Sequence, residues 1–334
     1  MPERLEQLKH WLDHELNFRE YTLTPASSDA SFRRYFRVLH AGISYIVMDA
    51  PPEKEDSRPF VSIARMLFDI GLNVPEIIDE NQEQGFLLLS DLGSTPYLEA
   101  LSEDTVERLY GDALGALSTL QAYIPGDAAL PAYDRALLLK EMELSREWLL
   151  GRHLGLSPDA TQTGLLDAAF QLLADNALAQ PQVCVHRDYH SRNLMQTGMH
   201  NPGILDFQDA VIGPVTYDLV SLLRDCYIDW PRDRVEDWAL GYQDLALQSG
   251  ILRAPHDDPQ QFLRWFDLMG MQRHLKAAGI FARLRYRDGK SGYLQDIPRT
   301  LGYVVEVAGR YEELAVFGRF IEGEVLARLP REGW

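Results

Sequence analysis

The residues best suited to chemistry in this sequence lie in one short segment near its middle. His186, Asp188 and Asn193 follow the spacing H-x-D-x-x-x-x-N, and Asp206 follows in the segment 204–207. Phosphoryl transfer needs a carboxylate that receives the proton of an attacking hydroxyl. It also needs oxygen ligands for the metal that bridges the phosphates. The spacing therefore predicts a phosphoryl-transfer site built on this loop.

Each of these side chains has a separate expected role. Asp188 is the expected catalytic base, because the acceptor hydroxyl must lose its proton while it is held in line with the transferred phosphate. Asn193 and Asp206 are the expected magnesium ligands, since Mg²⁺ prefers hard oxygen donors. His186 is expected to orient the loop, and Asp218, at the start of a following helix, to support it by accepting backbone N–H bonds. Taken singly, each acid or amide would be a turn or capping residue, so the combined spacing carries the interpretation.

Two segments nearer the N-terminus are predicted to contact a nucleotide. Residues 27–34 lie between two expected strands and are rich in small residues, whose backbone N–H groups can approach phosphate oxygens. The candidates there are Ser28, Asp29, Ala30, Ser31, Arg33 and Arg34. Neighbouring residues of a strand point to opposite faces, so only one of the two arginines is expected to reach the nucleotide. Ser90, Asp91 and Leu92 follow an apolar strand and are expected to offer backbone groups to an adenine, although a core strand with its exit turn explains them too.

The hydrophobic patterns predict two parts of different character. A helix over 3–16 precedes a stretch in which aromatic and β-branched residues predict strands. These strands cover 21–23, 31–38, 43–48, 74–75, 77–78 and 86–89, with a helix over 60–70 among them. After Gly93 the strand signal nearly vanishes. Helical patterns then cover 97–122, 135–150, 162–178 and the chain from 215 onward, with short strands at 183–185, 194–196 and 204–207.

The sequence therefore predicts an α+β protein of two lobes. Residues 1–93 are expected to form a small β-rich N-lobe that binds the nucleotide. Residues 94–334 are expected to form a large helical C-lobe with the catalytic loop and the substrate site.

The composition is ordinary for a globular protein. The chain has 334 residues, of which 46% are hydrophobic and 25% charged, so it is long enough for two lobes with their own cores. No segment approaches the ~20 apolar residues of a membrane-spanning helix, and the acidic start lacks the apolar core of a signal peptide. Cys184 and Cys226 agree with a reducing compartment. We expect a cytoplasmic protein with no membrane association.

The net charge of −18 limits the choice of partner. A field of that sign repels nucleic-acid phosphates, so no nucleic-acid partner is expected. It also repels ATP, so a nucleotide site must combine a locally positive pocket with a divalent metal.

Together these motifs resemble those of the aminoglycoside phosphotransferase and choline kinase group, which has the two-lobed protein-kinase-like fold. The resemblance rests on segments 28–30, 89–92, 186–193, 204–210 and 217–219, and so spans residues 20 to 225. Asp206 is followed by Phe-Gln rather than Phe-Gly, and no A-P-E segment follows, which favours a small-molecule kinase. The resemblance implies ATP and Mg²⁺ as cofactors.

A narrower resemblance connects segments 28–37, 47–52, 272–276 and 279–284 to the anomeric amino-sugar kinases of bacterial cell-wall recycling. It implies phosphorylation of the C1 hydroxyl of N-acetylmuramate and N-acetylglucosamine to the α-1-phosphate. A nucleotidyltransferase would then use that product toward UDP-N-acetylmuramate. Because the anomeric hydroxyl is more acidic than other sugar hydroxyls, a weakly basic carboxylate suffices as base.

Recognition of such a sugar is expected from the second half of the chain. Tyr189 and His190 directly follow the base and are expected to line the sugar site. Arg224 and Asp225 lie on the helix that follows Asp218. A basic cluster on a predicted helix over 258–284 consists of Arg273, His274 and Lys276. We expect one of these three to meet the carboxylate of muramic acid, and the alternative is a solvated helix face.

The sequence departs from the wider kinase pattern in the small lobe. Kinases carry a lysine on the third strand of that lobe, whereas the corresponding segment 45–49 has none, and the helix that follows has no glutamate. Arg33, Arg34 and Arg65 are the candidates to neutralise the phosphates, because the guanidinium fork suits phosphate oxygens.

Two other functions remain open from the sequence. One is a kinase of the same fold for a cationic alcohol such as an aminoglycoside, choline or homoserine, which an acidic pocket would suit. The other is a nucleotide-binding pseudokinase, which the missing lysine raises and the intact Asp188, Asn193 and Asp206 argue against. The basic cluster favours a neutral or anionic sugar.

Overall fold

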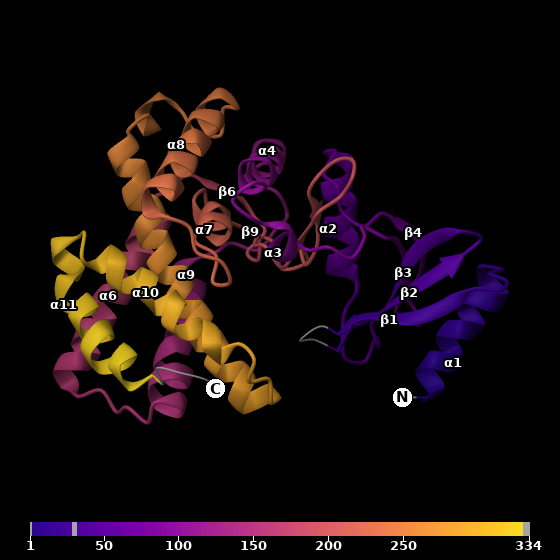
Figure 1. Ribbon diagram of the computed structural model, residues 1–334, viewed down its shortest axis with the longest axis horizontal. Coiled ribbons are helices and arrows are strands. Elements are labelled where there is room, and N and C mark those ends of the chain that lie inside the picture. The colour runs from indigo at the N-terminus through magenta and orange to yellow at the C-terminus, as the bar shows by residue number, and fades with distance from the viewer. Residues whose placement is uncertain (1, 29–31, 330–334) are drawn as a thin grey trace. The chain divides into compact units, whose positions relative to one another are not determined.

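The computed structural model describes residues 2–28 and 32–329. The chain forms two compact units (Figure 1). The first unit comprises residues 1–113 together with 192–209, and the second comprises 114–191 together with 210–334. The first carries a five-stranded antiparallel sheet and the second is mainly helical, which confirms the predicted α+β fold. The predicted functional boundary between residues 93 and 94 stays a prediction.

The sheet of the first unit has the strand order β1-β2-β3-β5-β4. Its strands are β1 Thr22–Ser28, β2 Arg34–His40, β3 Ile43–Asp49, β4 Ile77–Asn81 and β5 Phe86–Ser90. The turn between β2 and β3 is formed by Ala41 and Gly42, with φ of 51° and 81°. Two successive positive φ values give the turn a twist that matches paired strands. This turn fixes the register that sets Arg34 opposite Asp49.

One face of this sheet is covered by α1, Pro2–His10, which continues as a π-helical turn at Trp11–Glu15 (Figure 1). The core there unites Leu8, Trp11 and Leu12 of this helix with Val38, Val47, Phe86 and Leu88 of the strands. Strand residues alternate between faces, so Val47 and Asp49 of β3 face α1, whereas Ile46 faces the other way.

Three further helices begin in the first unit, and the last of them runs past residue 113 into the second unit. Helix α2, Arg58–Asp69, buries Phe60, Ile63 and Leu67. Helices α3, Tyr97–Ala100, and α4, Val106–Tyr123, replace the single helix predicted over 97–122. The break comes where Thr105 Oγ1 accepts a hydrogen bond from Ser102 N at 2.9 Å, so side-chain bonding competes with the helix.

Two short hairpin strands complete this unit. Strand β7, Leu194–Met195, pairs antiparallel with β8, Gly203–Ile204. The predicted strand over 204–207 was therefore too long, because β8 ends at Ile204 and Asp206 takes a left-handed conformation with φ of 62°. Aspartate tolerates this conformation better than most residues.

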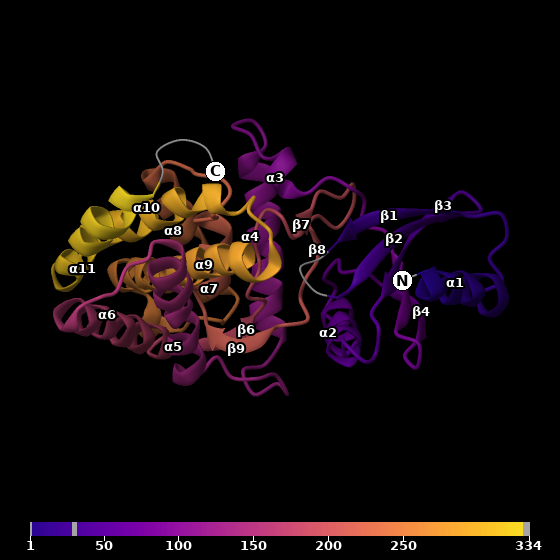
Figure 2. The same cartoon turned by 90° about the horizontal axis from the view of Figure 1, so that it is seen from below.

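The second unit is organised around α9, Pro259–Asp288 (Figure 2). The other helices of this unit are α5 Arg135–Leu144, α6 Ala160–Leu178, α7 Tyr217–Leu223, α8 Arg232–Gln248, α10 Ile297–Ala308 and α11 Ala315–Phe320. Helices α5, α6, α7, α8 and α10 all pack against α9. Asp258 caps its first turn and Gly289, with φ of 71°, ends it.

Close packing of α9 depends on Gly279. A Cβ at this position would collide with the backbone of Leu144 and Ser145, so only glycine lets the two helices cross here. Helix α5 continues past this crossing as a π-helical segment over Ser145–His153.

Strands β6, Gln182–Val185, and β9, Val211–Pro214, form a two-stranded sheet, and the predicted catalytic loop begins directly after β6. Strand β6 was predicted from the sequence and β9 was not, because Gly213 and Pro214 weaken its strand signal. Within the described residues, no helix is both long and apolar enough to cross a membrane.

Candidate functional site

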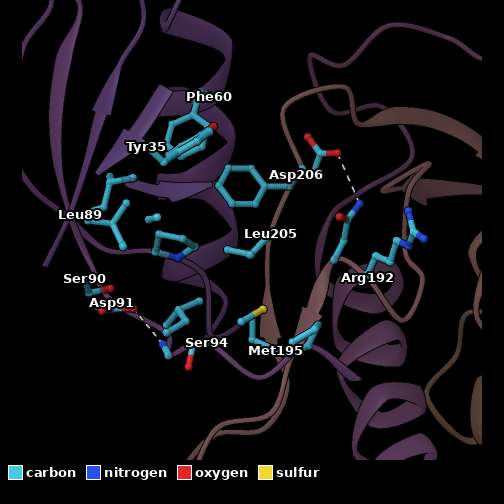
Figure 3. Close-up of a pocket in the computed structure, with 18 of the residues that line it drawn as sticks. Tyr35, Phe60, Leu89, Ser90, Asp91, Ser94, Arg192, Met195, Leu205 and Asp206 are labelled. Carbon is cyan, nitrogen blue, oxygen red and sulfur yellow. Dashed lines mark hydrogen bonds between the residues drawn. The ribbon is translucent and has the colours of Figure 1, made fainter. Parts of the chain in front are cut away.

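A cavity of about 480 Å³ lies within the first unit (Figure 3). Its walls are largely apolar and include Ala26, Tyr35, Ile46, Phe60, Pro75, Leu89, Met195, Leu205 and Phe207. Phe60 and Phe207 pack ring against ring with centroids 4.9 Å apart. Asn193 and Asp206 also line the cavity. Such a cavity offers an apolar slot for a planar ring and polar ligands at one end.

The hairpin of β7 and β8 brings Asn193 and Asp206 together. The backbone N–H of Leu205 donates to the carbonyl of Asn193 at 2.9 Å, which continues the pairing beyond the strands. Asn193 Nδ2 then donates to Asp206 Oδ2 at 3.3 Å, and Gln208 Nε2 donates to Asp206 Oδ1 at 2.7 Å. The two residues predicted as metal ligands are thus neighbours in one cavity.

The donor chemistry of this pair fits magnesium. An amide oxygen and a carboxylate are hard donors, and Mg²⁺ commonly takes one or two protein ligands while phosphate oxygens and water fill the rest. Among residues 2–28 and 32–329, no group of three or more His, Cys, Asp or Glu side chains could hold a metal. A metal bound by Asn193 and Asp206 would therefore take its remaining ligands from water and from the phosphates of a bound nucleotide.

The segment after β5 is fixed by an ion pair that the sequence analysis missed. Asp91 Oδ2 accepts from Arg37 Nε at 2.6 Å and from Ser44 Oγ at 2.5 Å, and its other oxygen accepts from the N–H of Gly93 at 3.0 Å. Arg37 also donates to the carbonyl of Gly93 at 2.9 Å. Burial raises the pKa of Asp91, but these contacts hold that pKa below its ordinary value. Arginine in an expected strand gave no signal of this role.

The three residues predicted to hold an adenine here all line the cavity. Besides Asp91, Leu92 contributes to the wall, and so does Ser90. Ser90 Oγ accepts from the N–H of Glu76 at 2.9 Å, so this hydroxyl ties the segment to the start of β4. The side chains of Ser90 and Asp91 are thus engaged in holding the segment, and their role toward a nucleotide stays a prediction.

The predicted phosphate loop is only partly described. Asp29, Ala30 and Ser31 lie outside the described residues, and Ser28 is placed by its backbone at the end of β1, paired with Arg34. Arg34 lies on the α1 face of the sheet, where Asp49 Oδ2 accepts from its Nε at 3.1 Å. Asp49 is fully buried and also pairs with Arg4.

Two of the arginines proposed in place of the missing lysine, Arg34 and Arg65, pair with acids outside the cavity. Asp49 stands on β3 with Arg4 and Arg34 as partners, and Arg65 donates to Glu80 at 3.1 Å on the surface. Among the described residues of the cavity wall, Arg192 is the one cation. Of the two arginines predicted as alternatives, Arg33, which directly precedes β2, remains a predicted candidate for a phosphate.

The predicted catalytic loop of the second unit is held by two carboxylates. Asp218 accepts from the N–H groups of His186 at 2.6 Å and Arg187 at 3.0 Å. Asp225 accepts from the N–H of Ser191 at 2.9 Å and of Tyr227 at 3.1 Å. Each end of the loop that carries Asp188 is thereby fixed to helix α7 or to the segment that follows it. Because Arg187 has a φ of 79°, these bonds also hold a conformation that is strained for a residue with a side chain.

The environment of Asp188 is cationic. Burial alone would raise the pKa of Asp188, but the positive charges of Lys276, His190 and Arg273 hold it below its ordinary value. The carboxylate is therefore ionised at neutral pH, as a proton acceptor must be. In contrast, burial raises the pKa of Asp218 to about 7.

A buried acid on α5 links Arg187 with Lys276, and its position in the sequence gave no prediction of this role. Glu141 forms ion pairs with Arg187 and, at 3.3 Å, with Lys276 Nζ, and it accepts a hydrogen bond from Tyr133. Although burial raises the pKa of Glu141, the two cations hold it below its ordinary value. The only available sequence signal was a glutamate in an otherwise amphipathic helix, which is common on solvated faces.

The basic cluster predicted to meet a substrate carboxylate is not a solvated helix face. Arg273, His274 and Lys276 are 6%, 2% and 7% exposed. Lys276 Nζ donates to Tyr217 at 2.9 Å, and Arg273 Nη1 lies 3.7 Å from Cys226 Sγ. That alternative was therefore wrong, and the expected role in substrate binding stays a prediction.

His274 differs from its two neighbours in charge. Its ring lies 2.8 Å from the carbonyl of Arg224, and burial lowers the pKa of His274 to about 3. It is therefore neutral at physiological pH and donates to that carbonyl.

Of the other predicted substrate residues, Tyr189 and Arg224 are buried in the second unit and His190 is partly exposed. Tyr189 is fully buried against His186, with ring centroids 5.6 Å apart. Arg224 is buried, pairs with Glu306 at 2.6 Å and lies over the ring of Tyr303. His190 is partly exposed and lies edge-on to Tyr227, with centroids 5.5 Å apart.

Comparison with known proteins gives this arrangement a family context. Residues 22–257 match the model of a family described as the phosphotransferase enzyme family. The solved structure of the ADP-bound aminoglycoside phosphotransferase APH(2'')-Ib superposes with a TM-score of 0.59, covering 90% of this chain and 97% of that one. Their sequence identity is 17%, so this similarity shows the fold alone.

Similarity to two bacterial proteins extends over almost the whole chain. A protein of Pseudomonas putida, strain KT2440, described as N-acetylmuramate/N-acetylglucosamine kinase, is 51% identical, covering 96% of this chain and 97% of the relative. A protein of the same description from Pseudomonas aeruginosa, strain PAO1, is 46% identical over 98% of this chain and 97% of the relative.

Proposed function

This chain belongs to the phosphotransferase enzyme family, and we propose that it transfers the γ-phosphate of ATP to the anomeric C1 hydroxyl of N-acetylmuramate and N-acetylglucosamine. The observation that carries the phosphotransfer is the pairing of Asn193 with Asp206 at the polar end of an apolar cavity. The identity of the sugar rests on the two Pseudomonas relatives, which are 51% and 46% identical and share that description.

The cavity of the first unit is the proposed nucleotide site. Its apolar walls accept the adenine, and the segment that Arg37 and Asp91 fix supplies backbone groups for the edge of the base. Asn193 and Asp206 would hold Mg²⁺ at the polar end of this cavity. The metal, when bound, neutralises negative charge on the phosphates and so lowers the barrier to attack by an oxygen.

Asp188 is the proposed base. It accepts the proton of the sugar C1 hydroxyl as that oxygen bonds to the γ-phosphorus, while the bond to the β-γ bridging oxygen breaks and ADP leaves. Five positions of chain separate Asp188 from Asn193, which limits the distance between their Cα atoms to about 18 Å. Asp218 and Asp225 keep the loop in shape while the base acts. Positioning and electrostatic stabilisation supply most of the rate.

The product would be the α-1-phosphate of the sugar. A sugar 1-phosphate is the usual acceptor of a nucleotidyl group, so we place a nucleotidyltransferase after this enzyme, as part of cell-wall recycling in the cytoplasm.

The test is turnover of ATP with Mg²⁺ over a panel of acceptors. The panel contains N-acetylmuramate, N-acetylglucosamine, choline, homoserine and an aminoglycoside. We expect turnover with the two amino sugars and none with the cationic alcohols. Turnover confined to a cationic alcohol would refute the sugar assignment, and tight ATP binding without any turnover would refute the assignment as an enzyme.

A further inference from the structure

An exposed cation lies at the polar end of the nucleotide cavity. Arg192 is solvent-exposed and lines the cavity next to Asn193. In Figure 3 it lies beyond Asp206, on the side away from the apolar residues Tyr35 and Leu89. The cavity thus presents, in order, an apolar wall, a pair of metal-binding oxygens and a guanidinium.

This order matches the groups that must meet during transfer. The base of the nucleotide occupies the apolar end, and its phosphates lie at Asn193 and Asp206. A side chain beyond the phosphates is placed at the end where the acceptor arrives. Arg192 also follows Asp188 by four positions, so the chain itself limits the distance between their Cα atoms to about 14 Å.

The surroundings of Arg192 would repel an anionic acceptor. Asp91, Glu99 and Asp206 line the same cavity, and the whole chain carries a net charge of −18. N-acetylmuramate differs from N-acetylglucosamine by a lactyl ether that ends in a carboxylate. Binding this carboxylate in a cavity lined by these acids needs a cation that the ligand can reach.

The side chains of the basic cluster on α9 are less exposed than that of Arg192. Arg273 and Lys276 are 6% and 7% exposed, and Lys276 is paired with Glu141. His274 is turned to the carbonyl of Arg224. Arg192, by comparison, is exposed and has the fork of donors that binds a carboxylate through two hydrogen bonds.

We propose that Arg192 binds the carboxylate of N-acetylmuramate and sets the preference for this sugar over N-acetylglucosamine. The inference rests on the proposed function, since it assigns a specificity residue to the same reaction. Arg192 on the predicted catalytic loop thus replaces the buried cluster on α9 as the expected contact of the carboxylate.

The experiment compares Arg192→Gln with the unmodified enzyme on both sugars at saturating ATP and Mg²⁺. Loss of a charge-assisted pair lowers kcat/KM for N-acetylmuramate by about 10- to 100-fold. The value for N-acetylglucosamine, which has no carboxylate, stays within about 2-fold because no such pair is lost. Arg192→Lys keeps the charge without the fork, so it retains part of the preference. Arg58→Gln is the control, because Arg58 is an exposed arginine of the same unit that pairs with Asp56.

Selective loss on N-acetylmuramate, with an unchanged melting temperature and Kd for ATP, supports the proposal. Equal losses on both sugars would overturn it, because they would assign Arg192 to the phosphates. Unchanged kinetics would also overturn it. If Arg192→Gln fails to fold, the same comparison with Arg192→Lys decides. Failure of the unmodified enzyme to phosphorylate either sugar would instead refute the proposed function itself, which separates the two outcomes.

Discussion

Replacing Glu141 with glutamine tests the buried ion cluster beside the catalytic loop. Glu141 is 5% exposed and is the anionic partner of both Arg187 and Lys276. Glutamine preserves the size of the side chain and removes its charge. Breaking a buried pair by neutralising one partner costs about 3–5 kcal/mol, since the remaining charges stay desolvated without compensation.

The same substitution should impair catalysis. Without the Glu141 carboxylate, the positive charges of Lys276 and Arg187 are no longer offset by that acid and attract the Asp188 carboxylate more strongly. They then stabilise its ionised form further and make it a weaker base. We expect kcat to fall by about 10-fold, which is a part of the roughly 10²- to 10⁴-fold that general-base catalysis supplies. The Kd for ATP should stay unchanged, because the cavity proposed to bind the nucleotide is lined by residues of the other unit.

Urea unfolding measures the stability change. Trp148, Trp230, Trp238 and Trp265 belong to the second unit, so tryptophan fluorescence reports mainly on it. At a slope of about 3 kcal/mol per molar, a loss of about 3 kcal/mol lowers the urea midpoint by about 1 M.

The matched control is Glu143→Gln on the same helix. The side chain of Glu143 is 49% exposed and pairs with Arg146 at 3.2 Å, and a surface pair of this kind contributes about 0–1 kcal/mol. A midpoint shift for Glu141→Gln no larger than that of the control would refute the interpretation of the cluster as a buried ion network.

Three further results are expected. Asp188→Asn should lower kcat by about 10³-fold or more with little change in the Kd for ATP. Asp206→Ala should instead weaken Mg²⁺-dependent ATP binding. Equal, small effects of both substitutions would contradict the assigned roles. Arg37→Ala should raise the KM for ATP several-fold with kcat nearly constant, because Asp91 loses the partner that fixes the adenine segment; an unchanged KM would contradict this. Burial raises the pKa of Asp218 to about 7 from 3.8, so its contribution to stability is complete below pH 4 and is lost as the pH rises to 7. Unfolding free energies between pH 4.5 and 7.5 should fall less steeply in Asp218→Asn than in the unmodified protein, and identical slopes would exclude this titration.

The sequence was most informative where chemistry and local pattern coincide. The spacing of Asp188, Asn193 and Asp206 has a direct chemical meaning, and the structure sets Asn193 beside Asp206. The strands of the sheet were predictable because aromatic and β-branched runs alternate with clear turns such as Ala41-Gly42. The α+β fold followed from the change of pattern after Gly93.

Contacts between residues distant in the chain were not predictable. Arg37 and Asp91 are 54 positions apart, and Glu141 and Arg187 are 46 apart, so no local pattern connects them. The basic cluster on α9 shows the same limit. Its spacing suited a solvated helix face. The structure instead buries the cluster, because residues of other elements pack against it, namely Tyr217, Cys226 and Glu141. Strand β9 was missed because its stability comes from pairing with β6, while its glycine and proline oppose a strand.

We propose that the oxygen-bearing side chains of the predicted catalytic loop and its hairpin direct the γ-phosphate of ATP to the C1 hydroxyl of an amino sugar. The decisive measurement is phosphorus NMR of the product formed from ATP, Mg²⁺ and each sugar. We expect one phosphomonoester signal coupled to the anomeric proton, and none with Asp188→Asn. A phosphate on any other hydroxyl, or the same product yield from Asp188→Asn, would contradict it.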